Sequence, residues 1–210
     1  SHGRKSKALI ENSRRSIAKH LNCQPAEIIF TSGGTEADNM ALNSAVNQMG
    51  VQHIITSRLE HHAVGHTAAV LTSKNIRVSY VKVCHKGNVD LDDLERLLQT
   101  EEKTLVALMH ANNEISTLLP LQEVSQMCRK YNALFLSDTV QTMGHYKFDL
   151  QELDIDFITC AAHKFHGPKG VGFTYINKST KIKSFIYNHT LYLDHSLLYL
   201  EITLFFSILF

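Results

Sequence analysis

A lysine positioned to react with an aldehyde lies in the segment AAHKFHGPKG (161–170). Lys164 follows an apolar stretch and precedes a Gly-Pro pair, which predicts that a rigid turn holds it at the edge of a sheet. A lysine amine can bind an aldehyde covalently, although an isolated lysine is ordinarily a solvated surface charge. The neighbouring His163 could contact a phosphate group, whereas Lys169 is a more typical solvent-facing charge.

A second candidate is an acidic side chain that closes an apolar segment. Asp138 lies in SDTVQT (137–142), and a buried carboxylate is costly unless it meets a cation or hydrogen-bond donors. A protonated pyridine nitrogen would be such a cation. The amides of Gln141 and of Asn113, in HANNE, could hold a phenolic oxygen on the same ring. The alternative is that Asp138 caps a helix over residues 139–142.

Two further segments could bind the remaining parts of such a ligand. In TSGGTEADN a phosphate fits beside Gly34 and Thr35, because backbone N–H groups and a helix dipole would meet it there; a tight turn capped by Thr35 is the alternative. In RLEHHAVGH, His61 could stack on a flat ring and move protons near neutral pH. With 13 histidines in the chain, a surface or capping role is the alternative for each, and it is our interpretation of His62 and His66.

These candidates follow strands of a sheet that the sequence pattern predicts. Apolar residues spaced for one helix face alternate with short apolar runs typical of buried strands, from about residue 5 to residue 177. Helices are expected at 5–21, 35–49, 61–74, 91–99 and 120–131, and strands at 27–32, 51–57, 77–83, 104–110, 133–137 and 156–162. This alternation predicts an α/β fold, with a mainly parallel sheet covered by helices on both faces. The candidates would then share the edge formed by the carboxyl ends of the strands.

Composition places the chain among globular proteins rather than disordered ones. Its 210 residues, 44% hydrophobic and 20% charged, suffice for one domain with a buried core. A formal charge of +1 offers no field to attract nucleic acid or an acidic membrane. Cys23, Cys84, Cys128 and Cys160 lack metal-ligand spacing, and the first residues do not resemble a signal peptide. We therefore expect reduced cysteines, no bound metal and a cytoplasmic location.

Residues 187–210 differ from the rest of the sequence because they are apolar without glycine, turn residues or a clear period. Asp194 and Glu201 interrupt this stretch, and an acidic residue at the centre of a membrane helix costs about 2.5–3.5 kcal/mol. We therefore expect a core domain over residues 1–180 and a divergent tail, not a membrane span.

Five motifs in this order, TSGGTEADN, LEHHAV, HANNEI, SDTVQT and AHKFHGPKG, resemble those of the cysteine desulfurases in the class V aminotransferase superfamily, over roughly residues 1–180. The resemblance implies the large domain of a fold type I enzyme, with a seven-stranded sheet and pyridoxal 5′-phosphate (PLP) as cofactor. It implies that Lys164 binds PLP covalently, that Asp138 pairs with the pyridine nitrogen, and that His61 stacks on the ring and moves protons. The other residues implied to bind the cofactor are Gly34, Thr35 and His163 at the phosphate, and Asn113 and Gln141 at the ring oxygen and the substrate side.

The resemblance also implies L-cysteine as substrate, a homodimer, and transfer of sulfur through an enzyme cysteine to an acceptor or scaffold protein for iron–sulfur clusters. This sequence has Ala161 where many members have a phosphate-binding serine. No cysteine matches the sulfur-accepting position, and Cys160 lies within a predicted core strand. N- and C-terminal parts of the family pattern are absent, so we expect an incomplete chain that is inactive alone.

Three alternatives remain at this level. Selenocysteine lyases and other class V enzymes share the same core, so the resemblance does not fix the substrate. A non-catalytic PLP-binding remnant is the second alternative, supported by the unmatched cysteine. A dinucleotide-binding domain is disfavoured, because the sequence has no GxGxxG motif and no acidic residue placed for a ribose.

Overall fold

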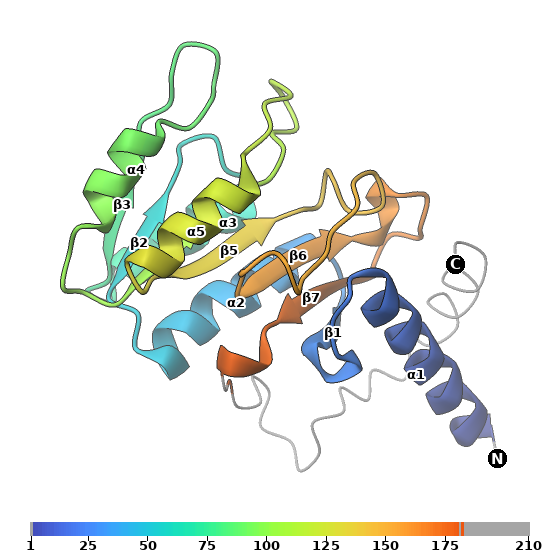
Figure 1. The fold of residues 1–210 in the computed structure, drawn as a ribbon. Coiled ribbons are helices and arrows are strands. Elements are labelled where there is room, and N and C mark those ends of the chain that lie inside the picture. The colour runs from blue at the N-terminus through green and yellow to red at the C-terminus, as the bar shows by residue number, and fades with distance from the viewer. Residues whose placement is uncertain (1, 181, 183–210) are drawn as a thin grey trace.

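The computed structural model describes residues 2–180 and 182, and its centre is a seven-stranded β-sheet with helices on both faces (Figure 1). The strands are β1 (Ile28–Thr31), β2 (His53–Thr56), β3 (Arg77–Tyr80), β4 (Thr104–Ala107), β5 (Leu134–Asp138), β6 (Phe157–Ala161) and β7 (Gly172–Ile176). Their order across the sheet is β1-β7-β6-β5-β4-β2-β3. β7 is antiparallel to both of its neighbours, and all other neighbouring pairs are parallel. The predicted mainly parallel sheet is therefore confirmed, whereas the predicted tail at 187–210 lies outside the described residues.

Five α-helices lie close to the five that the apolar spacing predicts. They are α1 (His2–His20), α2 (Gly34–Met49), α3 (His62–Thr72), α4 (Leu91–Leu98) and α5 (Leu121–Lys130). Local chemistry sets several of their ends: Gly50 ends α2 in the left-handed conformation, with φ of 73°, and the Asp90 side chain accepts the Asp93 N–H at the start of α4. None of the helices in this part of the chain is both long enough and apolar enough to cross a bilayer.

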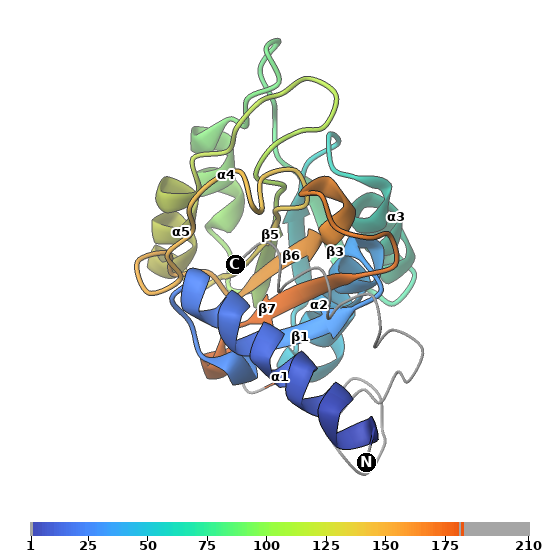
Figure 2. The same ribbon diagram turned by 90° about the vertical axis from the view of Figure 1, so that its right-hand side faces the viewer.

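The helices form two layers because successive strand residues point to opposite faces. α1, α4 and α5 pack into one hydrophobic cluster, which contains Phe135 of β5 and Cys160 of β6. α2 and α3 pack into the other, which contains Leu136 of β5 and Phe157 of β6 (Figure 2). Both faces of the central strands are covered, which explains why their sequences are almost continuously apolar.

Candidate active site

The predicted site residues follow the carboxyl ends of strands that run in one direction. β1 and β6 are both antiparallel to β7 and hence parallel to each other, and β2, β4, β5 and β6 are parallel along the sheet. The segments that leave these ends carry the predicted residues, namely Gly34, Thr35, His61, Asn113, Asp138, Gln141, His163 and Lys164. The topology therefore delivers these segments to one edge, as expected for a ligand site in an open α/β sheet.

The start of α2 lies directly against two other segments of this edge. A Cβ atom added at Gly34 would lie 2.7 Å from Val140 Cγ2, and 3.8 Å from the Cβ of Ala161. Only glycine allows this close approach. The first turn of α2 has N–H groups that no helix carbonyl can accept. The one carboxylate of this turn, Glu36, is turned back to accept the N–H and hydroxyl of Ser32, at 2.6 and 2.5 Å. These backbone N–H groups are suited to an anion.

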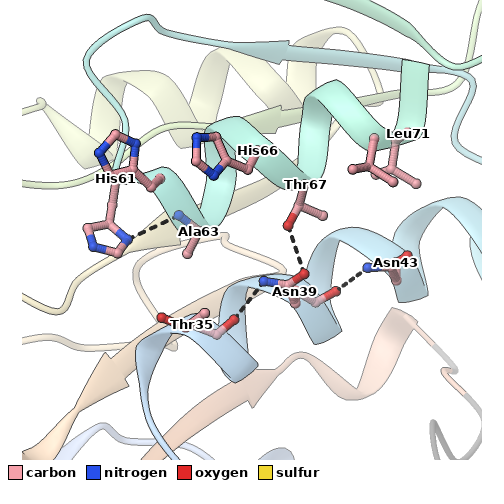
Figure 3. Close-up of a pocket in the computed structure, with 10 residues that line it drawn as sticks. Thr35, Asn39, Asn43, His61, Ala63, His66, Thr67 and Leu71 are labelled. Carbon is pink, nitrogen blue, oxygen red and sulfur yellow. Dashed lines mark hydrogen bonds between the residues drawn. The ribbon is translucent and has the colours of Figure 1, made fainter. Parts of the chain in front are cut away.

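His61 has the capping role that the sequence left open. Its Nδ1 atom accepts the N–H of Ala63 at 3.2 Å at the start of α3, while the side chain stays exposed. His61 and Thr35 both line a hollow of about 390 Å³ between α2 and α3. Figure 3 shows the two helices side by side there, joined by the hydroxyl of Thr67, which donates to Asn39 Oδ1 at 2.8 Å. The cap therefore fixes the position of an imidazole beside the start of α2.

The rings of His62 and His66 pack on each other, with centroids 4.9 Å apart, and both residues are exposed. This arrangement agrees with the surface role expected for them. Among the described residues no group of three or more His, Cys, Asp or Glu side chains is arranged to hold a metal ion.

Asp138 is buried and lies near His61. It is 5% exposed, and its Oδ1 accepts the N–H of Val140 at 2.8 Å. Residues 140–142 form a turn rather than a helix, and Asp138 caps this turn by accepting the Val140 N–H, so the capping alternative holds for a turn and not for a helix. Burial raises the pKa of Asp138, while the Val140 N–H and the charge of His61 lower it. The burial effect is the largest, so the nearby His61 charge compensates the buried carboxylate only in part.

Two further acidic residues beside Asp138 were not predicted. Asp38 of α2 is 1% exposed, and the Thr159 hydroxyl donates to its Oδ1 at 2.6 Å. Burial, and then the charge of Asp138, raise its pKa well above the usual range. Glu60 accepts the Ser57 hydroxyl at 2.7 Å and the Met109 N–H at 2.8 Å, and burial raises its pKa to about 8.

The sequence contained a signal for Asp38, because this acid occupies a helix position four residues after Gly34. Residues four apart lie on one helix face. If the start of α2 packs closely on the sheet, Gly34 faces the sheet, and Asp38 then faces it as well. An acidic residue on that face, beside the alanines 37 and 41, is an exception to the pattern of a buried stripe.

Lys164 and His163 belong to a short 3₁₀ helix, η2 (Ala162–Lys164), directly after β6. Both residues are exposed. The carbonyl of Ala162 accepts the N–H groups of Phe165 and Gly167, at 3.0 and 2.8 Å, which forms the tight turn that the Gly-Pro pair predicted. His145 Nε2 lies 3.1 Å from the Lys164 carbonyl oxygen. The backbone of Lys164 is therefore held at the sheet edge while its amine is accessible.

The two predicted amide donors, Asn113 and Gln141, differ in how far they are exposed to solvent. Asn113 is exposed, whereas its neighbour Asn112 is buried and braces the loop: the Asn112 Nδ2 donates to the Leu59 carbonyl at 2.8 Å. The sequence reasoning singled out Asn113 and missed this role of Asn112. Gln141 is half-buried in the turn after Asp138. Next to it, Thr142 Oγ1 lies 2.9 Å from Nδ1 of His110, a buried histidine whose pKa burial lowers to about 4.

Two of the four cysteines lie on the opposite side of the sheet from Asp38. Cys128 and Cys160 are fully buried in the cluster beneath α1, α4 and α5. Thr159 reaches Asp38 on the α2 side, so its neighbour Cys160 points to the other face. Cys23 is half-buried, and Cys84 is exposed.

Comparison with known proteins identifies the fold and the family. The chain is 44% identical over 187 residues to cysteine desulfurase IscS of Dictyoglomus turgidum, covering 88% of this chain and 47% of that protein. It is 36% identical to a mitosomal cysteine desulfurase of Trachipleistophora hominis, covering 87% of this chain and 42% of that protein. Among solved structures it superposes on a NifS-like protein with a TM-score of 0.84 and 39% identity, over 90% of this chain and 53% of that one.

A second solved structure, SspA in complex with cysteine, gives a TM-score of 0.81 at 28% identity, over 88% of this chain and 54% of that one. The chain thus spans about half the length of the curated relatives it matches. The family model described as aminotransferase class-V matches residues 1–189. The chain belongs to the class V aminotransferase family.

Proposed function

We propose that this chain is the PLP-binding core of a cysteine desulfurase, which acts on L-cysteine. The cysteine desulfurases to which it is similar depend on PLP. The observation that carries the proposal is the convergence at one sheet edge of an accessible lysine, a buried aspartate, an exposed imidazole and a helix start, supplied by Lys164, Asp138, His61 and α2.

The residues of this edge fit PLP by their chemistry. The phosphate needs donors, which the first turn of α2 offers beside Gly34, with the hydroxyl of Thr35 and the ring of His163 as further candidates. A pyridinium nitrogen needs a carboxylate, and Asp138 is a buried carboxyl group whose charge His61 compensates only in part. When bound, PLP supplies a protonated ring that withdraws electrons from the α-carbon of an amino acid.

Each of the remaining residues has a distinct role in this proposal. Lys164 would hold the cofactor covalently through its amine, from a turn fixed by the Ala162 carbonyl. His61, fixed by its bond to the Ala63 N–H, would lie on the ring and move protons on the substrate side. Gln141 and Asn113 are the proposed amide donors to the ring oxygen and the substrate side.

The sulfur-accepting thiol is not assigned to any of the four cysteines. Cys128 and Cys160 are buried on the far side of the sheet, and burial raises the pKa of both thiols, which disfavours the thiolate that would attack sulfur. We propose that this thiol, the partner subunit and the sulfur acceptor complete the site from other segments or chains. The proposed assembly is a cytoplasmic homodimer that delivers sulfur for iron–sulfur clusters.

Covalent trapping tests the assignment of Lys164. The chain is incubated with PLP, reduced with borohydride, digested and mapped by mass spectrometry. We expect the pyridoxyl group on Lys164, its loss in Lys164→Ala, and its retention in Lys169→Ala, the neighbouring exposed lysine. Labelling that persists in Lys164→Ala at the wild-type level would contradict the assignment, and so would absence of any specific label.

A further inference from the structure

Two buried carboxyl groups face the same space between α2 and the sheet. Asp138 of β5 is paired in register with Thr159 of β6, and parallel neighbours in register point to the same face. The hydroxyl of Thr159 donates to Asp38 on α2, at 2.6 Å from Oδ1. Asp38 and Asp138 are 1% and 5% exposed. Thr159 therefore places an acid of the helix layer beside the acid of the sheet.

The surroundings of the two groups are unequal. Asp138 accepts the Val140 N–H and is close enough to His61 for the imidazole charge to favour its ionised form. Asp38 accepts only the Thr159 hydroxyl among the described residues, and its buried Oδ2 atom has no hydrogen-bond partner there. A buried ionised oxygen without a donor is far costlier than a buried neutral hydroxyl without an acceptor.

The other acidic groups around Asp38 also favour its neutral form. Glu60, from the loop after β2, and Asp138 both oppose a negative charge on Asp38. Cys160 of β6, on the opposite face, is itself affected by the charges of Asp38 and Asp138. The His61 imidazole is a cation whose charge acts on Asp138. Two adjacent carboxylates cannot both ionise cheaply, so the pair divides into an acid and a base according to these surroundings.

We propose that Asp38 is a positioning residue for Asp138: at neutral pH Asp38 holds the proton of the pair as a neutral carboxylic acid and leaves Asp138 as the carboxylate. The part of this inference that concerns the cofactor rests on the proposed function, since it is the PLP ring nitrogen that Asp138 would face. The protonation of Asp38 is a property of the chain by itself. At higher pH, ionisation of Asp38 adds a second negative charge behind Asp138 and strengthens its hold on a cation.

Infrared spectroscopy of the chain without cofactor tests the protonation directly, because the carbonyl stretch of a carboxylic acid is separate from the bands of a carboxylate. Glu60→Gln serves as the background, so that Glu60 does not contribute a second acid band. We expect a band at about pH 7 that Asp38→Asn removes. Thr159→Val should keep the band and shift it to higher frequency, because the donor to Oδ1 is gone.

Asp93→Asn is the matched control for the infrared experiment. Asp93 is 5% exposed, like Asp138, but it accepts the Lys82 N–H and the guanidinium of Arg96, which lower its pKa. Its variant should leave the band unchanged. The proposal would be overturned if the acid band is the same in the background protein, in Asp38→Asn and in Thr159→Val. If one of the two variants fails to fold, an unchanged band in the other, folded variant is sufficient to overturn it.

PLP binding, measured by equilibrium dialysis between about pH 6 and pH 9, tests the coupling to Asp138. At about pH 7, Asp138→Asn should weaken binding by roughly tenfold or more, because an amide cannot balance a ring cation. Asp38→Asn should weaken it by less than about threefold, and its deficit should grow with pH. Equal losses in both variants at pH 7 would show that Asp38 is ionised. Absence of PLP binding by the wild type would refute the proposed function, while the infrared result would still decide the protonation of Asp38.

Discussion

The environments of the four cysteines differ enough to set their reactivity. Cys84 is exposed, and backbone N–H groups, first that of Lys86, lower the pKa of its thiol. Burial raises the pKa of Cys23 to about 12. Cys128 and Cys160 are fully buried, and burial raises their pKa values further still. Reactivity follows the accessible thiolate, so the four thiols should separate clearly.

We predict that iodoacetamide modifies Cys84 at least about tenfold faster than the other three cysteines in the folded chain, since a tenfold difference needs only one unit of thiol pKa or a small difference in access. Peptide mapping by mass spectrometry at several time points gives the rates. Cys84→Ser should remove the fast phase, and urea should make Cys128 and Cys160 reactive. If Cys160 is modified as rapidly as Cys84, then Cys160 of β6 is not buried as the structure describes.

At the scale of single residues, the sequence predicted positions better than it predicted environments. Lys164 and His61 could be placed because each follows a strong apolar strand and a recognisable turn or cap. The place of Asp38 on the packed face of α2 could be deduced from its spacing, but its hydrogen-bond partner could not, because Thr159 is 121 residues away in the sequence. Likewise, HANNE does not reveal which of its two asparagines braces the loop.

At the scale of elements, α2 connects the proposed anion site to the rest of the sheet edge. Its first residue, Gly34, packs on Val140 and Ala161, and its fourth turn ends at Gly50. A small displacement of this helix start would therefore move the proposed phosphate donors and Asp38 together.

We predict that Gly34→Ala destabilises the chain by about 1–3 kcal/mol, as overpacking typically does, because the added methyl group would lie 2.7 Å from Val140 Cγ2. Urea unfolding gives the free energy, and PLP binding should weaken in parallel. Gly65→Ala is the matched control: Gly65 lies inside α3, and an added Cβ meets nothing within 4 Å. That control should be neutral or stabilising by up to about 1 kcal/mol.

The double variant Gly34→Ala/Val140→Ala distinguishes the steric cause from a general loss of helix structure. Removing the Val140 methyl groups should restore part of the stability lost in Gly34→Ala, because the two changes are in contact and do not add. Strict additivity of the two free-energy changes would mean that this contact does not set the position of α2.

The elements themselves were largely predictable, because the central strands are buried on both faces and because α4 and α5 have apolar residues along one side and polar residues along the other. β7 was the exception. It is antiparallel to its neighbours, and its first residue, Gly172, packs so closely that an added Cβ would lie 2.8 Å from Gly33 Cα. This contact between two glycines forms only in the assembled sheet, so the local pattern of apolar residues could not predict it.

At the scale of the whole molecule, buried histidines and buried carboxyl groups change the stability of the fold in opposite directions as the pH rises. Burial lowers the pKa values of His53 and His110 to about 4, so these histidines favour unfolding as the pH falls from about 6.5 to 4. Burial raises the pKa of Glu60 to about 8, and those of Asp38 and Asp138 are also raised. A carboxyl group with a raised pKa binds its proton more tightly in the folded state, so its contribution to stability is lost as the pH rises.

We predict that the chain without cofactor becomes less stable as the pH rises from about 6.5 to 8, and that Glu60→Gln reduces this loss. Glu60 has an ordinary pKa of 4.5 and a folded value of about 8, so folding becomes less favourable by at most about 1.4 kcal/mol per pH unit across that interval. Glutamine can keep the bond to the Met109 N–H and does not ionise. Melting temperatures at pH 6.5, 7.25 and 8 give the slopes, with Glu123→Gln, an exposed position on α5, as the control that should retain the wild-type slope. A Glu60→Gln slope equal to that of the wild type would show that Glu60 is already ionised at pH 6.5 and that its titration does not cause the loss of stability between pH 6.5 and pH 8.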